Sequence, residues 1–71
     1  MKQLTEKQLA IFNYIKGFIT DNGYSPIAKE IQSRFGYASQ NAAIEHLNAI
    51  EKKGYIKRTP KIARSIVVLQ A

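Results

Sequence analysis

Apolar residues recur at helical spacing over the first third of the chain. This stripe has intervals of three and four residues and consists of Leu9, Phe12, Ile15 and Ile19, broadened by Ile11 and Phe18. Thr5 is a candidate helix cap, with Gln8 three residues later as its capping-box partner. Asn22-Gly23 ends the pattern, because glycine suits the left-handed position after a helix. We therefore expect a helix over residues 5–22 that buries this stripe.

A second, shorter helix is predicted directly afterwards. Its apolar residues lie four apart and are Ile27, Ile31 and Phe35. Pro26 favours a first-turn position and Ser25 can cap it, while Ile27 is the alternative last residue before the helix. Gly36 ends the pattern, which predicts a helix over residues 26–35.

A third helix is expected over residues 39–53. Ser39 is a good cap for its start, and Gly54 stops it. At about 100° per residue its core-facing side chains are Ala43, Leu47 and Ile50. Two helices joined by a short turn that contains glycine form a helix-turn-helix arrangement.

The pattern changes to a strand-like one after Gly54. Residues 55–59 alternate in character, residues 65–69 are mostly apolar and β-branched, and residues 60–64 supply a turn with two cations. We expect a β-hairpin over residues 55–69 with a basic tip, or wing. The predicted fold is mainly α with a small β-hairpin, a three-helix winged helix-turn-helix in one domain over residues 1–71.

The outward face of the third helix is polar but carries little charge. It consists of Asn41, Glu45, Asn48 and Lys52, flanked by Ala42, Ile44 and Ala49. Asparagine can pair with adenine, glutamate can accept from the cytosine amino group, and alanine or isoleucine can touch a thymine methyl group. Glu45 is the most informative, because phosphates repel an acid unless it reads a base or orients a neighbour. Each residue alone also fits a plain solvated surface, and Ile44 fits a half-buried shoulder.

Positive charge is concentrated at the end of the chain. The net charge is +6, yet no acidic residue follows Glu51. Six basic residues do follow it: Lys52, Lys53, Lys57, Arg58, Lys61 and Arg64. We expect them to face phosphates, as in a nucleic-acid-binding surface. A basic solubilising tail is the alternative, but the segment is rich in Ile, Val and Leu.

Several classes of function are disfavoured by composition. With no cysteine, one histidine, few acids and no glycine-rich phosphate loop, the chain offers no catalytic, metal or cofactor constellation, and no small-molecule site is evident. His46 is expected to pack on the shoulder of the core rather than to act as a ligand or base. The longest apolar run of the chain is far shorter than the ~20 residues of a membrane span, and the start of the chain lacks a secretory signal. A soluble cytoplasmic protein without membrane contact is expected.

Short runs of residues over essentially the whole chain match the pattern of one protein family. They include Arg34-Phe35-Gly36-Tyr37, Asn41-Ala42-Ala43, Glu45-His46-Leu47 and Lys53-Gly54. In these residues the chain resembles the amino-terminal domain of LexA-type repressors. The resemblance implies a winged fold with its helix-turn-helix near residues 28–48. It also implies base contacts from Ser39, Asn41, Ala42 and Glu45, and phosphate contacts from the wing near Lys61 and Arg64.

Three features depart from that family. Position 44 is Ile where the family commonly has an acid, and position 27 is Ile where it often has a Ser or Thr cap. The family's second domain, which self-cleaves and dimerises, is absent from this sequence. We expect either an excised DNA-binding fragment or a stand-alone regulator of bacterial or phage origin, with the abrupt end favouring the fragment.

Sequence-specific binding of double-stranded DNA, serving transcriptional repression, is the leading hypothesis. Bases would be read by Ser39, Asn41, Ala42, Ile44, Glu45 and Asn48, and phosphates bound by the six basic residues after Glu51. A second copy would bind the other half of a palindromic operator. The alternative is a protein-interaction module that docks through Ile44 and Tyr37, since fold alone does not settle function. RNA binding is a weaker variant.

Overall fold

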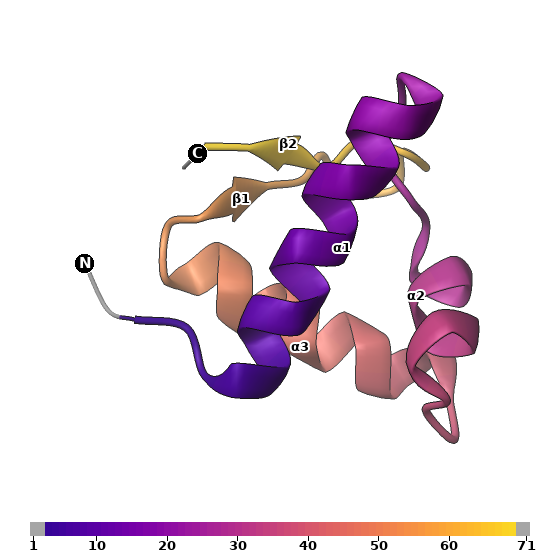
Figure 1. The fold of residues 1–71 in the computed structure, drawn as a ribbon, viewed down its shortest axis with the longest axis vertical. Helices are drawn as coiled ribbons and strands as arrows, with labels where there is room; N and C mark the ends of the chain where they lie inside the picture. Colours follow the sequence, from indigo (N-terminus) through magenta and orange to yellow (C-terminus); the bar gives the residue numbers. More distant parts are fainter. Residues whose placement is uncertain (1–2, 70–71) are drawn as a thin grey trace.

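The computed structural model describes residues 3–69 as three helices and a two-stranded antiparallel sheet. In chain order the elements are α1 (Glu6–Asn22), α2 (Ala28–Phe35), α3 (Gln40–Lys52), β1 (Ile56–Lys57) and β2 (Val67–Val68). In Figure 1, α1 crosses α3, and the two strands lie on the side of the molecule away from α2. Both α1 and α2 pack on α3, and β1 follows α3 against the same core. The predicted winged helix-turn-helix fold is confirmed.

The start of α1 is fixed by a capping box, as the sequence predicts. The Thr5 Oγ1 accepts the Gln8 backbone N–H at 3.2 Å, and the Gln8 Oε1 accepts the Thr5 backbone N–H at 3.1 Å. Two of the unpaired N–H groups at this helix start are thereby satisfied. At the other end Gly23 has φ 79°, the left-handed conformation expected there, and donates its N–H to the Ile19 carbonyl at 2.8 Å.

The buried stripe of α1 is displaced from the one that was predicted. Ile11 and Ile15 have no exposed surface and Phe12 has 3%, whereas Leu9 is 47% exposed. On a helical wheel Leu9 lies about 160° from Ile11, so one helix face cannot bury both. The inclusion of Leu9 in the core is therefore wrong, and the buried stripe consists of Ile11, Phe12 and Ile15.

The start of α2 also differs from the prediction. The helix begins at Ala28 rather than at residue 26, because Ile27 is still extended at φ −99° and ψ 165°. Ser25 does not cap it: the side chain is buried and its Oγ accepts the Ile66 backbone N–H at 3.1 Å. The Glu30 carboxylate takes over part of the capping role by accepting the Ile27 N–H at 2.9 Å. Ile27 is thus the last residue before the helix, which was the alternative prediction.

The turn of the helix-turn-helix depends on Gly36 and Ser39. Gly36 adopts φ 70° and lets the chain reverse immediately after α2. The Ser39 Oγ then caps α3 by accepting the Ala42 N–H at 3.3 Å. Between them Tyr37 stacks on Phe35 and on His46, with ring centroids 5.9 and 5.2 Å apart. His46 is a packed residue at this turn, as expected.

The hairpin has a short ladder and a longer connecting segment. Only Ile56 and Lys57 pair with Val68 and Val67, so the paired strands are shorter than the predicted ones. The connecting segment is closed by Ser65, whose Oγ donates to the Thr59 carbonyl and accepts the Thr59 N–H, both at 3.1 Å. This clip holds the two ends of the wing together where backbone pairing stops.

One core joins the helices to the hairpin. Its buried residues come from all three helices and both arms of the hairpin: Ile11, Phe12, Ile15, Ile31, Ala43, Leu47, Ile50, Ile56 and Ile66. The predicted core face of α3 is confirmed, since Ala43, Leu47 and Ile50 are at most 2% exposed. Burying these residues fixes which face of α3 remains outside. Within residues 3–69, no helix combines the length and the apolar character that a membrane crossing requires.

Candidate nucleic-acid interface

The exposed face of α3 lies opposite its buried side. Asn41, Glu45 and Asn48 are all exposed, and we call this set the reading face. Their spacing of four and three residues places them along one line of the helix surface. Lys52 is exposed one further turn along. The structure thus exposes together all four polar residues that the helical wheel grouped.

Two side chains of the reading face contact each other. The Asn41 Nδ2 donates to the Glu45 Oε2 at 3.4 Å, a long and exposed hydrogen bond. Asn41 keeps its carbonyl oxygen, and Glu45 keeps its other carboxylate oxygen. This end of the reading face therefore presents mainly acceptors, which suit the amino groups of cytosine and adenine in a major groove.

The remaining predicted base-reading residues lie at the margins of this face. The Ser39 Oγ already accepts a helix N–H, and its hydroxyl proton is left to donate. Ala42 and Ile44 are half-buried. Ile44 lines an open groove of about 610 Å³ between α3 and the wing, together with Glu51, Arg58 and Ile62. At the half-buried Ile44 and Tyr37, less apolar surface is exposed for protein docking than the alternative hypothesis assumed.

Arg64 is held by the body of the protein. Its two terminal nitrogens donate to the two Glu30 oxygens at 3.0 and 3.1 Å, and one also donates to the Ser25 carbonyl at 3.0 Å. The guanidinium also lies over the Tyr24 ring, 4.6 Å from its centroid. The Arg64 hydrogen bond is the main reason why the pKa of Glu30 is lowered, with a smaller contribution from the Ile27 N–H. The same pair raises the pKa of Arg64.

Two further cations of the predicted phosphate-binding set also have protein partners. The Arg58 Nε donates to the Glu51 Oε1 at 2.9 Å, and its Nη2 donates to the Asn48 Oδ1. The Lys53 Nζ donates to the Gln8 Oε1 at 2.6 Å and to the Gln3 carbonyl at 3.0 Å, at the start of α1. We call Lys53, Arg58 and Arg64 the anchored cations.

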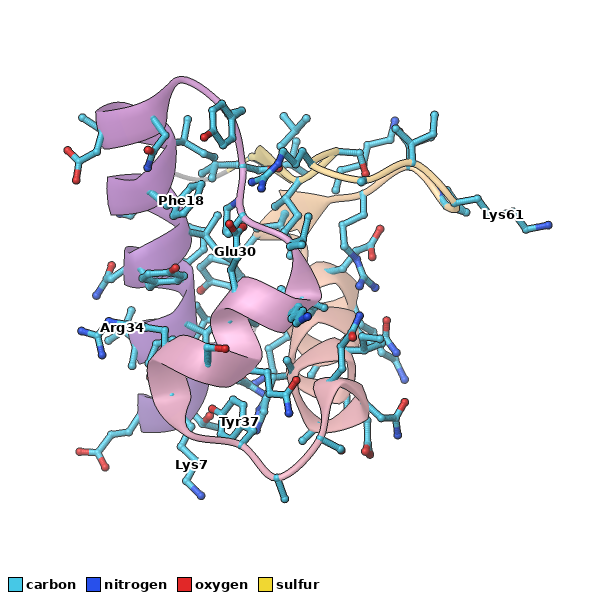
Figure 2. The ribbon with its side chains drawn as sticks, turned by 90° about the vertical axis from the view of Figure 1, so that its right-hand side faces the viewer. Lys7, Phe18, Glu30, Arg34, Tyr37 and Lys61 are labelled. Carbon is cyan, nitrogen blue, oxygen red and sulfur yellow. The ribbon has the colours of Figure 1, made fainter. Side chains whose placement is uncertain are left out.

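The other three predicted phosphate ligands are unengaged. The side chains of Lys52, Lys57 and Lys61 make no hydrogen bond or ion pair with any described residue, and all three are exposed. We call them the free lysines. Lys61 sits at the tip of the wing and extends away from the helices (Figure 2). It has a positive φ of 65°, which turns the chain at this tip.

Sequence reasoning missed the residues that anchor the arginines. Glu30 was given no role, Glu51 was used only as the last acidic residue, and Ser25 was considered only as a cap. The partners lie 34 and 7 positions apart in the chain, and neither spacing is a helical neighbour distance. The capping-box position of Glu30, three residues after Ile27, was the one local signal that this acid has a structural task.

The chain is similar in sequence to LexA repressors and their DNA-binding domain. Residues 1–65 match the family described as the LexA DNA binding domain. The chain is 47% identical over 70 residues to the LexA repressor of Thermosipho melanesiensis, covering 99% of this chain and 35% of that protein. It is 41% identical over 69 residues to the LexA repressor of Staphylococcus aureus, covering 97% of this chain and 33% of that protein. The chain spans about a third of the length of these relatives. It belongs to the LexA DNA-binding domain family.

Proposed function

We propose that the chain binds double-stranded DNA sequence-specifically, with α3 in the major groove. The observation that carries this proposal is the exposed reading face of α3, with Lys52 one turn further along the helix and Lys61 in the groove beside it. Asn41, Glu45 and Asn48 are exposed polar side chains on one line of α3, and the buried side of the helix fixes their direction. An α-helix with such a face fits a major groove, where hydrogen bonding distinguishes all four base pairs.

The free lysines supply the sequence-independent part of the affinity. Lys52 lies at the end of α3, Lys57 lies on β1 and Lys61 lies at the wing tip. Lys52 follows Asn48 by one turn of α3, and Lys61 lines the groove that also contains Ile44. Lysine binds phosphate well as a point charge. Such contacts fix the register of the helix in the groove but carry no sequence information.

The biological role follows from the family. The named relatives are repressors, and we infer that this chain occupies promoter DNA in the bacterial cytoplasm and blocks transcription. A single module of this size buries on the order of 600–1,000 Å² and binds weakly alone. Two copies on half-sites about one helical turn apart, or a multiple of it, would give useful affinity on a palindromic operator.

The test is selection from a random DNA pool, followed by titration of the enriched site and a scrambled duplex at several salt concentrations. We expect a defined half-site, at least a thousandfold preference over scrambled duplex, roughly as for other specific binders, and a steep fall of affinity with salt. Equal affinity for both duplexes with little salt dependence would contradict the proposal. The same experiment reports the half-site spacing and the base preferred near Ile44.

A further inference from the structure

Arg58 connects the hairpin to the reading face through two side chains of α3. Both oxygens of Glu51 hold it: Oε1 accepts the side-chain Nε–H at 2.9 Å, and Oε2 accepts the backbone N–H at 3.3 Å. The side chains of Arg58 and Glu51 are 23% and 34% exposed, so neither is freely solvated. With its backbone and its Nε both fixed, Arg58 has one terminal nitrogen directed at Asn48.

The chemistry of this contact determines how the Asn48 amide is oriented. A guanidinium group has only donors, so the amide atom that faces it must be the carbonyl oxygen. The Asn48 NH2 group is therefore turned away from Arg58. Asn48 is exposed on the reading face, seven residues after Asn41. Without Arg58 the two ends of the amide could exchange places at little cost.

We propose that Arg58 is a positioning residue which, held by Glu51, presents the Asn48 NH2 group as a hydrogen-bond donor to the DNA. The proposal rests on the proposed DNA binding and adds a specificity to it. A donor at this point favours base edges with acceptors in the major groove: guanine O6 and N7, adenine N7 or thymine O4. The opposite end of the reading face, at Asn41 and Glu45, presents acceptors. The two ends of the reading face thus favour opposite hydrogen-bonding patterns: acceptors at Asn41 and Glu45, and a donor at Asn48.

Restraint of Asn48 before binding also favours discrimination. An exposed asparagine loses rotamer freedom when it contacts a base, and a side chain that is already held loses less. Arg58 itself is poorly suited to phosphate, because Glu51 already neutralises its charge at contact distance. The unengaged Lys57 is adjacent in sequence and offers the matched comparison.

The experiment compares the wild-type chain with Glu51→Gln/Arg58→Met, which removes one acid and one base and leaves the net charge unchanged. Random-pool selection reports base preferences, and salt titration reports the number of phosphate contacts. We expect the double variant to lose about tenfold discrimination at one base pair, with its salt dependence unchanged. Lys57→Met should show the reverse: unchanged base preferences, weaker binding to all sequences and a shallower salt slope.

A second variant keeps the proposal testable if the double variant is unstable. Asn48→Ala leaves Arg58 and Glu51 in place, suits an exposed helix position, and should lose discrimination at the same base pair. Adding it to the double variant should cause no further loss, because the three residues act as one unit. Base preferences that survive in Glu51→Gln/Arg58→Met or in Asn48→Ala overturn the positioning role, as does a shallower salt slope in the double variant. If the wild-type chain enriches no site, the proposed function itself fails, and that outcome is visible before any variant is made.

Discussion

The outward face of α3 and the hairpin both carry exposed polar side chains, but these side chains have different partners in the two regions. On α3, the exposed Asn41 and Glu45 share one long hydrogen bond, and the reading face carries little charge. Around the hairpin, charge is divided by residue type: Arg58 and Arg64 bind acids of the helices, whereas Lys57 and Lys61 have no partner within residues 3–69. The positive charge available to a partner is thus smaller than the total charge suggests.

The division between arginine and lysine has a physical reason. The guanidinium group is planar and can meet both oxygens of a carboxylate, as Arg64 does with Glu30. An ammonium group is a compact and strongly hydrated charge on a flexible stem, which suits a mobile contact to a phosphate. The arginines therefore position the hairpin on the helices, and the free lysines provide the positive charge that is available to a partner.

The largest effect is expected for a change in the hydrophobic core, which holds both α3 and the hairpin. Leu47→Ala removes a buried side chain between the reading face and the core, and we expect a loss of about 3 kcal/mol in the free energy of unfolding. Both specific and non-specific DNA binding should weaken together as the folded fraction falls. Urea unfolding followed by circular dichroism measures the loss. Lys52→Ala, on the exposed side of the same helix, is the matched control and should stay within about 0.5 kcal/mol of wild type.

Glu45→Ala separates reading from phosphate binding. We expect it to cost about 1–3 kcal/mol in the preference for the selected site over sites changed at one base pair. Affinity for scrambled duplex should stay equal or rise, because an acid near the phosphates has been removed. Competition titrations with single-base variants of the selected site measure both quantities. If binding to all sequences weakens equally, Glu45 does not read a base.

The elements could be predicted more readily than the contacts between them. Thr5, Ser39 and Gly23 act within a few residues of themselves, so local chemistry was enough to place the ends of α1 and the start of α3. Leu9 was misplaced because a stripe at three- and four-residue intervals leaves its own centre uncertain by one position, and only the tertiary packing of Ile11 settles it. The outward direction of the reading face followed from the buried Ala43, Leu47 and Ile50.

The engagement of the cations could not be predicted in the same way. Whether Arg64 faces solvent or Glu30 depends on the path of the wing back over α2, which no local pattern encodes. Lys53 likewise meets Gln8 only because α1 crosses the end of α3. A count of basic residues therefore predicts that positive charge lies late in the chain, but it cannot distinguish the free lysines from the anchored cations.

Lys61→Met and Arg64→Met sharpen this distinction with a smaller expected effect. Loss of one phosphate contact at Lys61 should make the slope of log affinity against log salt shallower by about 0.9. Binding should weaken by the same factor for every DNA sequence. Arg64→Met should leave that slope unchanged and lower the unfolding temperature, because its partners are Glu30 and Ser25. Salt titrations and thermal unfolding of both variants provide the measurements. Equal slope changes would show that Arg64 leaves Glu30 to bind DNA.

The smallest expected effect concerns the pH dependence of the wing anchor. The pKa of Glu30 is lowered in the folded chain, chiefly by the hydrogen bond from Arg64, so the unfolded chain takes up the proton first as pH falls. The anchor's contribution to stability is therefore complete above the ordinary glutamate value of 4.5 and is lost as pH falls below it toward the lowered folded pKa. We expect the unfolding temperature of wild type to fall more steeply over this range than that of Glu30→Gln, which has no carboxylate to titrate there. Arg64→Met removes the main cause of the lowered Glu30 pKa, so its unfolding temperature should also fall less steeply than that of wild type over this range. Parallel curves for wild type and Glu30→Gln would show that the Glu30–Arg64 pair does not hold the wing in solution.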